Sequence, residues 1–174
     1  SLESAALTMS SEQSFGQEET SPRLRMAYLA ICFLGLMLIA IASTVMGPAF
    51  PLILKEFAVP FGILGFLASA LNLGYITTPA GGILSDRYGE PIVLMIGLLA
   101  AGVAVGLASA ATDYPALILL FLITGTGAAF AEVAMNSLVT KFYPHKSGFA
   151  LNVLHLFFSM GAFLGPVLAG ALIT

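Results

Sequence analysis

Two pairs of polar residues lie within otherwise apolar stretches of the chain, and their types could bind a proton or a polar solute. Glu132 and Asn136 are four residues apart in one stretch, and Asn152 and His155 are three apart in the next. These spacings place side chains on one face of a helix. A carboxylate inside a bilayer costs roughly 2.5 kcal/mol or more unless it faces protein or water. We interpret Glu132 as a proton- or substrate-binding carboxylate, or alternatively as a neutral acid hydrogen-bonded to a neighbouring helix.

The two pairs also agree in depth. Glu132 lies nine residues before Lys141, and His155 lies nine residues after Lys146. Nine residues correspond to about 13 Å along a helix, which reaches about the middle of a ~30 Å hydrocarbon core. The sequence therefore predicts either a polar-lined space between these two helices or a structural clamp in which Asn and His hydrogen bonds join them.

Other chemistry has little support in the sequence. Asn72 is a further candidate for lining a solute pathway, because it is an amide inside an uncharged run. Glu132 and His155 are too few ligands for a metal site. The chain has no nucleophile–base pair and no phosphate-binding loop, so we expect no enzyme, no metal and no cofactor.

The composition is that of a membrane protein. Hydrophobic residues make up 59% of the 174 residues and charged residues 9%, against about 25% charged in an ordinary soluble domain. The mean hydropathy is +1.01. A soluble fold of this size has too little interior to bury so much apolar surface, so the lipid bilayer is an expected partner. The net charge of −3 excludes nucleic-acid binding, which requires a basic face.

The apolar residues fall into five long segments. Each segment is long enough for the ~20 residues that a helix needs to cross a bilayer, and far too long for the ~10-residue strands of a membrane barrel. We expect an all-α membrane protein with five transmembrane helices that follow a disordered polar tail. The tail covers 1–25, and the helices cover about 26–54, 57–85, 91–112, 114–140 and 147–174.

The basic residues predict the orientation of these helices. On one side of the predicted bundle lie Arg23, Arg25, Arg87, Lys141 and Lys146, and on the other lies Lys55 alone. Cytoplasmic loops carry the excess of Lys and Arg in membrane proteins. The N-terminus and the even-numbered loops are therefore expected in the cytoplasm of a cell (plasma or inner) membrane.

A short charged turn joins the second and third segments, and it resembles the loop signature of the major facilitator superfamily, G-x-L-x-D-R-x-G followed by two basic residues. The matching positions are Gly82, Leu84, Asp86, Arg87 and Gly89. Glu90 and Pro91 stand where the basic residues are expected. The resemblance implies the N-terminal half of a twelve-helix fold, without its sixth helix, and a missing C-terminal half as its partner. It also implies that Asp86 and Arg87 help to hold the two halves together and so gate the transporter.

Two further segments resemble the fucose-permease-like sugar symporter branch of that superfamily. One runs from Glu132 to Asn136, and the other from Ala150 to Pro166. This resemblance implies that Glu132 takes part in substrate binding and proton coupling, although the helix-one Asp of that branch has no counterpart here. Gly161 and Gly165 with Pro166 also resemble the helix-five motif of drug–proton antiporters, and their spacing predicts close helix packing.

These observations favour a secondary transporter that moves a small polar solute, such as a sugar, together with protons by alternating access. A drug/proton antiporter of the same superfamily is the first alternative. A non-transporting membrane scaffold subunit is the second, which the loop signature and Glu132 argue against.

Overall fold

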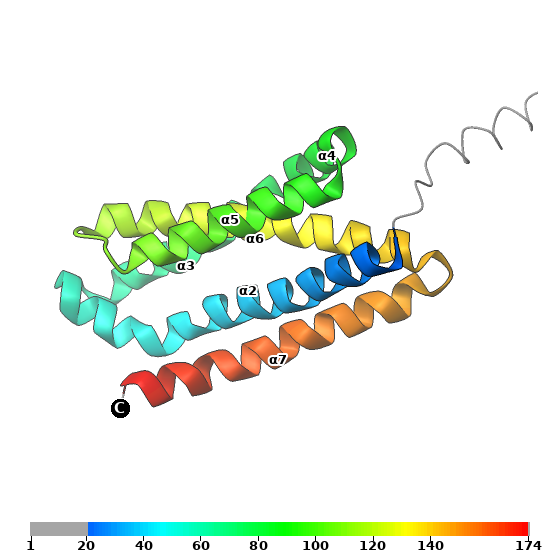
Figure 1. Cartoon of the computed structure of the whole chain (residues 1–174). Coiled ribbons are helices and arrows are strands. Elements are labelled where there is room, and N and C mark those ends of the chain that lie inside the picture. The colour runs from blue at the N-terminus through cyan, green and yellow to red at the C-terminus, as the bar shows by residue number, and fades with distance from the viewer. Residues whose placement is uncertain (1–20, 174) are drawn as a thin grey trace, which may run out of the picture.

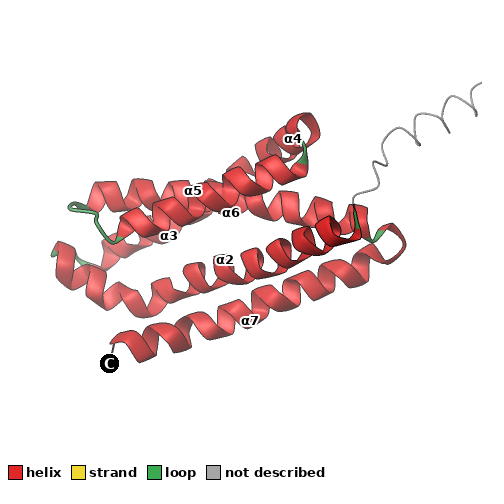
Figure 2. Ribbon diagram, viewed as in Figure 1, coloured by secondary structure: helices red, strands yellow, loops and turns green. Residues whose placement is uncertain are grey.

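The computed structural model describes residues 21–173, which form helices and turns with no strand among them (Figure 1, Figure 2). The elements are α2 (Pro22–Phe57), η1 (Phe61–Ile63), α3 (Leu64–Gly74), η2 (Tyr75–Thr77), α4 (Thr78–Tyr88), α5 (Glu90–Ala108), α6 (Tyr114–Phe142), η3 (Pro144–Lys146) and α7 (Ser147–Ile173). They make up five helical spans that are long and apolar enough to cross a membrane. The predicted all-α membrane fold is confirmed.

The first helix begins earlier than the sequence predicted. The tail was expected to be disordered over 1–25, but α2 begins at Pro22. The Ser21 hydroxyl accepts a hydrogen bond from the backbone N–H of Leu24 at 3.3 Å, and proline suits the first position of a helix because its φ is already helical. The prediction was therefore wrong for residues 22–25, and residues 1–20 lie outside the described part of the chain.

The boundary between the first two spans is shifted as well. Helix α2 continues through Pro48 and Pro51 to Phe57, and Figure 1 shows it changing direction in this last part. Ala58 then adopts a left-handed conformation with φ of 50°, which ends a helix by turning the chain away from its axis. The second span therefore starts at Phe61 rather than at residue 57.

The second span is also interrupted in its middle, where a continuous helix was expected. The 3₁₀ turn η2 separates α3 from α4. The hydroxyl of Thr77 donates to the carbonyl of Gly74 at 2.6 Å, and that of Thr78 donates to the carbonyl of Tyr75 at 2.5 Å. Such local bonds to the backbone are what Ser and Thr side chains make in membrane helices.

The third helix ends at Ala108, four residues before the predicted end at 112. The reason is the start of the next helix. Asp113 is extended and its side chain accepts a hydrogen bond from the Ala116 N–H at 2.8 Å. The chain must turn between Ala108 and Asp113 to reach this cap. The residues of the turn are partly apolar, and for this reason the sequence placed them in the helix.

Helix α6 is central in the bundle. It lies along α5 on one side and along α3 and α4 on another, while α2 lies along α7 (Figure 1). The main core joins α2, α5, α6 and α7 through fully buried side chains such as Leu36, Met135 and Leu154. A smaller core near the opposite end surrounds Leu64, Leu67 and Leu117.

Glycines set the closest helix contacts. A Cβ built on Gly161 would overlap the carbonyl of Met37, and one on Gly165 would overlap the hydroxyl of Thr44. Helix α7 therefore approaches α2 closely, as the small-residue spacing predicted. Pro166 lies next to this contact, inside α7.

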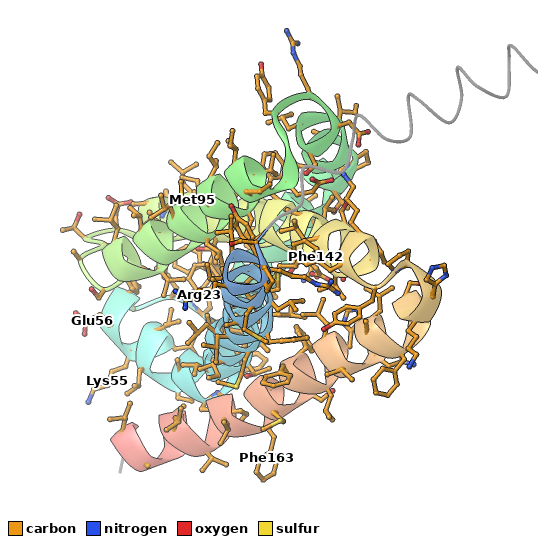
Figure 3. All side chains as sticks on the ribbon, turned by 45° about the vertical axis from the view of Figure 1, so that its right-hand side comes forward. Arg23, Lys55, Glu56, Met95, Phe142 and Phe163 are labelled. Carbon is orange, nitrogen blue, oxygen red and sulfur yellow. The ribbon has the colours of Figure 1, made fainter. Side chains whose placement is uncertain are left out.

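Large apolar side chains cover much of the outside of the bundle. Phe163 of α7 is 73% exposed and Met95 of α5 is 63% exposed, and both project outward in Figure 3. An apolar surface of this kind is stable in lipid.

Candidate functional site

The basic residues gather at one end of the bundle, as predicted. At this end the Arg25 guanidinium donates to the carbonyl of Phe142 and lies 4.8 Å from the ring centre of Tyr143. An arginine at the last carbonyls of a helix is favourable because the helix dipole is negative there. Lys55 projects with Glu56 from the other end of α2 (Figure 3).

The loop signature forms the turn from α4 to α5 at this same end. Gly89 has φ of 87°, and its N–H donates to the carbonyl of Ser85 at 2.9 Å. Leu84 packs against the main core. Asp86 and Arg87 are exposed, and neither forms an ion pair within the described residues. The Arg87 guanidinium lies 5.4 Å from the ring centre of its neighbour Tyr88.

Gly82, the first matching position of the loop signature, does not lie at a close helix contact. A Cβ at Gly82 would meet nothing within 4 Å among the described residues, whereas a Cβ at Gly81 would lie 3.0 Å from the ring of Phe130. The close approach of α4 to α6 thus occurs one residue earlier. Two successive glycines made the choice between them ambiguous in the sequence.

Glu90 is a residue whose role the sequence reasoning missed. It is the first residue of α5 and is only 7% exposed. Its carboxylate forms an ion pair with Lys141 and accepts a hydrogen bond from the Ser137 hydroxyl at 2.9 Å. The pair joins the start of α5 to the end of α6. The sequence did contain a signal for this ion pair, because Glu90 and Lys141 both lie at the same predicted membrane surface.

Glu132 lies in α6, ten residues before the end of the helix at Phe142, and is half-buried. Its side chain interacts with that of Tyr75, which comes from the 3₁₀ turn of the second span. It has no ion pair within the described residues. Within the described chain, this interaction comes from the second span.

Asn136 lies one turn further along the same face of α6. Its side-chain carbonyl oxygen is buried and has no hydrogen-bond partner in the described part of the chain. A buried acceptor of this kind is uncommon and costly, so it marks a position where a polar partner is favourable.

Asn152 and His155 are exposed on α7. No hydrogen bond joins either side chain to α6 within residues 21–173, and α7 lies along α2 instead. The hydrogen bonds of the predicted clamp are therefore not formed in the described chain, and the polar-lined space stays a prediction. Asn72 is exposed on α3, and its amide donates to the carbonyl of Ala68 in its own helix at 2.7 Å.

An open apolar groove of about 490 Å³ runs between α2, α5 and α6. Most of its lining is aliphatic, such as Leu34, Leu38 and Leu98, and Glu132 is not part of it. No group of three His, Cys, Asp or Glu residues that could hold a metal occurs in the described residues.

The five apolar spans define a multi-pass membrane protein. A family model described as Major Facilitator Superfamily matches residues 32–174. The chain therefore belongs to the Major Facilitator Superfamily, a family of transporters.

Two relatives illustrate its place in that family. The chain is 30% identical over 144 residues to "Uncharacterized MFS-type transporter Rv1250" of Mycobacterium tuberculosis; the match covers 80% of this chain and 24% of that protein. It is 25% identical over 142 residues to "Quinolone resistance protein NorA" of Staphylococcus aureus, with 80% of this chain and 37% of that protein covered. The chain thus spans well under half the length of these relatives. Neither name supports the fucose-permease-like branch.

Proposed function

We propose that this chain is the N-terminal part of a proton-coupled secondary transporter in the cell membrane, with its N-terminus in the cytoplasm. The observation that carries the proposal is Glu132. It is a half-buried acid in the interior of a membrane-spanning helix, with a tyrosine and no basic residue as its partner in the described chain. Acids in such positions are kept for function, because they are expensive in a bilayer.

In this proposal Glu132 binds one proton and releases it on the other side of the membrane. The acid is neutral when protonated and charged when it is not, so its two states favour different surroundings. Transporters of this kind rock two bundles around a site near the bilayer midplane. The second bundle is the missing C-terminal half, and the exposed Asp86 and Arg87 are available to hold it.

The solute is proposed to be small and polar, such as a sugar. Amides and imidazoles are well suited to hydrogen-bond hydroxyl groups. The buried, unpartnered Asn136 oxygen is the observation that favours this choice, and the exposed Asn152, His155 and Asn72 supply further polar groups. Because these residues come from three helices, they would act together only in the assembled transporter.

Drug/proton antiport is the second candidate. It is favoured by the relative named for quinolone resistance, and by the close contact of Gly161 and Gly165 with α2, next to Pro166. In this case Glu132 would bind a proton and a cationic solute in turn. A scaffold subunit without transport is the remaining alternative.

The test is solute-driven proton movement in proteoliposomes that contain the full-length protein, with a sugar panel and a lipophilic-cation panel. Glu132→Gln should abolish proton movement while leaving expression intact. Glu56→Gln is the matched control, because it removes an exposed carboxylate at the far end of α2 (Figure 3). Proton influx with a sugar supports symport, exchange with cations supports antiport, and neither response supports the scaffold.

A further inference from the structure

Helices α2 and α7 both start at the basic end of the bundle and lie side by side (Figure 1). The rings of Phe33 and Phe157 stack with their centres 5.0 Å apart. Four residues further along each helix, Gly161 meets the carbonyl of Met37. The contacts advance in the same direction on both helices, so α2 and α7 are parallel. Residues that lie equally far before the stacked rings are therefore at the same depth in the bundle.

Two basic residues are at the same depth in this way. Arg23 lies ten residues before Phe33 on α2, and Lys146 lies eleven residues before Phe157, directly ahead of α7. At about 1.5 Å per residue, both lie about 15–17 Å beyond the stacked rings. Eleven residues make about three helical turns, which places Lys146 near the face of α7 that meets α2. The two cations thus lie near each other where the helices begin.

An exposed apolar side chain follows each cation, one turn further into the bundle. Met26 lies three residues after Arg23, and Phe149 lies three residues after Lys146. Residues three apart share one side of a helix. Met26 is 68% exposed and Phe149 is 71% exposed. Each helix therefore presents a positive charge and then hydrocarbon, which is complementary to a lipid with an anionic headgroup above its acyl chains.

Neither cation has a partner in the described chain. Of the neighbouring basic residues, Arg25 donates to a carbonyl at the end of α6, and Lys141 is paired with a glutamate of α5. Arg23 and Lys146 are exposed, and their side chains form no hydrogen bond or ion pair within residues 21–173. Their charges are therefore available for a ligand at this place.

No acid of the described chain offsets these charges locally. The sequence contains no Asp or Glu from Ser21 to Lys55 and none after Glu132. The α4–α5 turn at the same end differs, because Asp86 stands next to Arg87 there. Basic residues that are not neutralised at a membrane surface attract anionic lipids, and basic pockets between membrane helices bind lipid headgroups.

We propose that the starts of α2 and α7 form a binding site for one anionic phospholipid. Its phosphate binds between Arg23 and Lys146, and an acyl chain lies along Met26 and Phe149. The arginine suits this role because its planar guanidinium binds two phosphate oxygens at once, while the lysine adds a point charge. With the orientation proposed above, the site faces the cytoplasmic leaflet. The inference does not depend on Glu132 or on transport.

The test maps lipid contacts in the full-length protein. It is reconstituted in phosphatidylcholine vesicles that contain a minor amount of phosphatidylglycerol with a photoreactive group in its acyl chain. Matched vesicles carry photoreactive phosphatidylcholine instead. After irradiation, mass spectrometry gives the ratio of phosphatidylglycerol to phosphatidylcholine crosslinking at Met26 and Phe149. Met95, an exposed residue of α5 (Figure 3), provides the reference position.

In the wild type, this ratio should be higher at Met26 and Phe149 than at Met95. Arg23→Gln and Lys146→Gln should each lower it about fivefold, since one basic residue at the surface contributes about that factor. Arg23→Lys should keep most of the preference, because the charge remains. Unchanged phosphatidylcholine crosslinking at Met95 shows that a variant is folded.

Two substitutions serve as matched controls. Lys55→Gln removes an exposed cation at the other end of α2, and Arg87→Gln removes one at the same end, beside Asp86. Both should leave the ratio at Met26 and Phe149 unchanged. An equal fall in Arg87→Gln would show that the whole basic end attracts lipid without a defined site, and this would overturn the proposal.

Two further results would overturn it. The first is a wild-type ratio at Met26 and Phe149 no higher than at Met95, which would mean that another part of the full-length chain covers this place or that the lipid charge is not recognised. The second is a preference that arises only after Glu18→Gln and Glu19→Gln, which would assign the two cations to the acids that precede the described residues.

Discussion

The contact between α5 and α6 gives the sharpest prediction for the fold, because two glycines face each other across it. A Cβ built on Gly97 would lie 2.5 Å from the backbone nitrogen of Ala131 and 2.6 Å from the carbonyl oxygen of Gly127. A Cβ built on Gly127 would lie 2.6 Å from the nitrogen of Ala101. Ordinary van der Waals contact begins at 3.4 Å. The helices would have to separate by 0.9 Å, the difference between 3.4 and 2.5 Å.

The expected cost follows from two opposing terms. Overpacking typically costs about 1–3 kcal/mol, and alanine in place of glycine within a helix gains about 0.5–1 kcal/mol. Gly97→Ala and Gly127→Ala should each destabilise the fold by about 1–2 kcal/mol. The matched controls are Gly102→Ala and Gly106→Ala on α5, the helix of Gly97, where a Cβ meets nothing within 4 Å in the described chain. These control substitutions should stabilise the fold by about 0.5–1 kcal/mol.

Cys32 provides the assay. It is the single cysteine of the sequence and is fully buried at the centre of the core, so a thiol reagent reacts with it only after the bundle opens. The midpoint of this reaction is measured in the 174-residue chain as denaturing detergent is added to mixed micelles. The midpoint should fall in Gly97→Ala and Gly127→Ala and rise in Gly102→Ala and Gly106→Ala. Movement of both pairs in the same direction would refute the account of α5–α6 packing.

Two further predictions concern the turn between α4 and α5. Glu90→Gln should destabilise the bundle by about 1–3 kcal/mol, because it breaks charge-assisted hydrogen bonds at a buried site. Lys141→Gln should destabilise the bundle less, because the Lys141 side chain is 64% exposed. The exchange Glu90→Lys with Lys141→Glu should recover part of the stability lost in Glu90→Lys alone; no recovery would show that the pair does not join the helices. Gly89→Ala should lower the free energy of unfolding by about 1–3 kcal/mol, because φ of 87° is unfavourable for a residue with a side chain. Gly82→Ala is the control and should not destabilise the bundle, because a Cβ there meets nothing within 4 Å in the described chain. Equal effects of the two substitutions in the same unfolding assay would contradict this reason.

The sequence was sufficient to predict the spans and the special roles of a few glycines. Long uncharged runs between short charged turns leave little choice but membrane helices. Gly89 was matched to the loop signature, and it turns the chain there with a positive φ. Gly161 and Gly165 were expected to permit close packing, and they contact α2.

The identity of each helix's neighbours was beyond the sequence. Spacing shows which residues share a face, but it does not show what that face meets. Glu132 and His155 match in depth, yet α7 lies mainly along α2, and Glu132 interacts with Tyr75 of the second span. Consecutive helices need not pack along their whole length, and no hydrogen bond joins the two polar pairs in the described chain.

The interruption of the second span was hidden for a different reason. Gly74, Thr77 and Thr78 all carry signals for an irregular turn, but each is also common in a regular membrane helix. Only the contact of Gly74 with the α6 backbone decides between these possibilities. That contact depends on a residue pair about fifty positions apart, which local sequence does not report.

The central claim is that Glu132 carries the coupled proton, and one measurement tests it most directly. Proteoliposomes containing the full-length protein are loaded with a pH-sensitive dye, and solute is added from the sugar and lipophilic-cation panels. The account predicts solute-dependent proton movement in the wild type and in Glu56→Gln, and none in Glu132→Gln. Undiminished proton movement in Glu132→Gln would contradict the account.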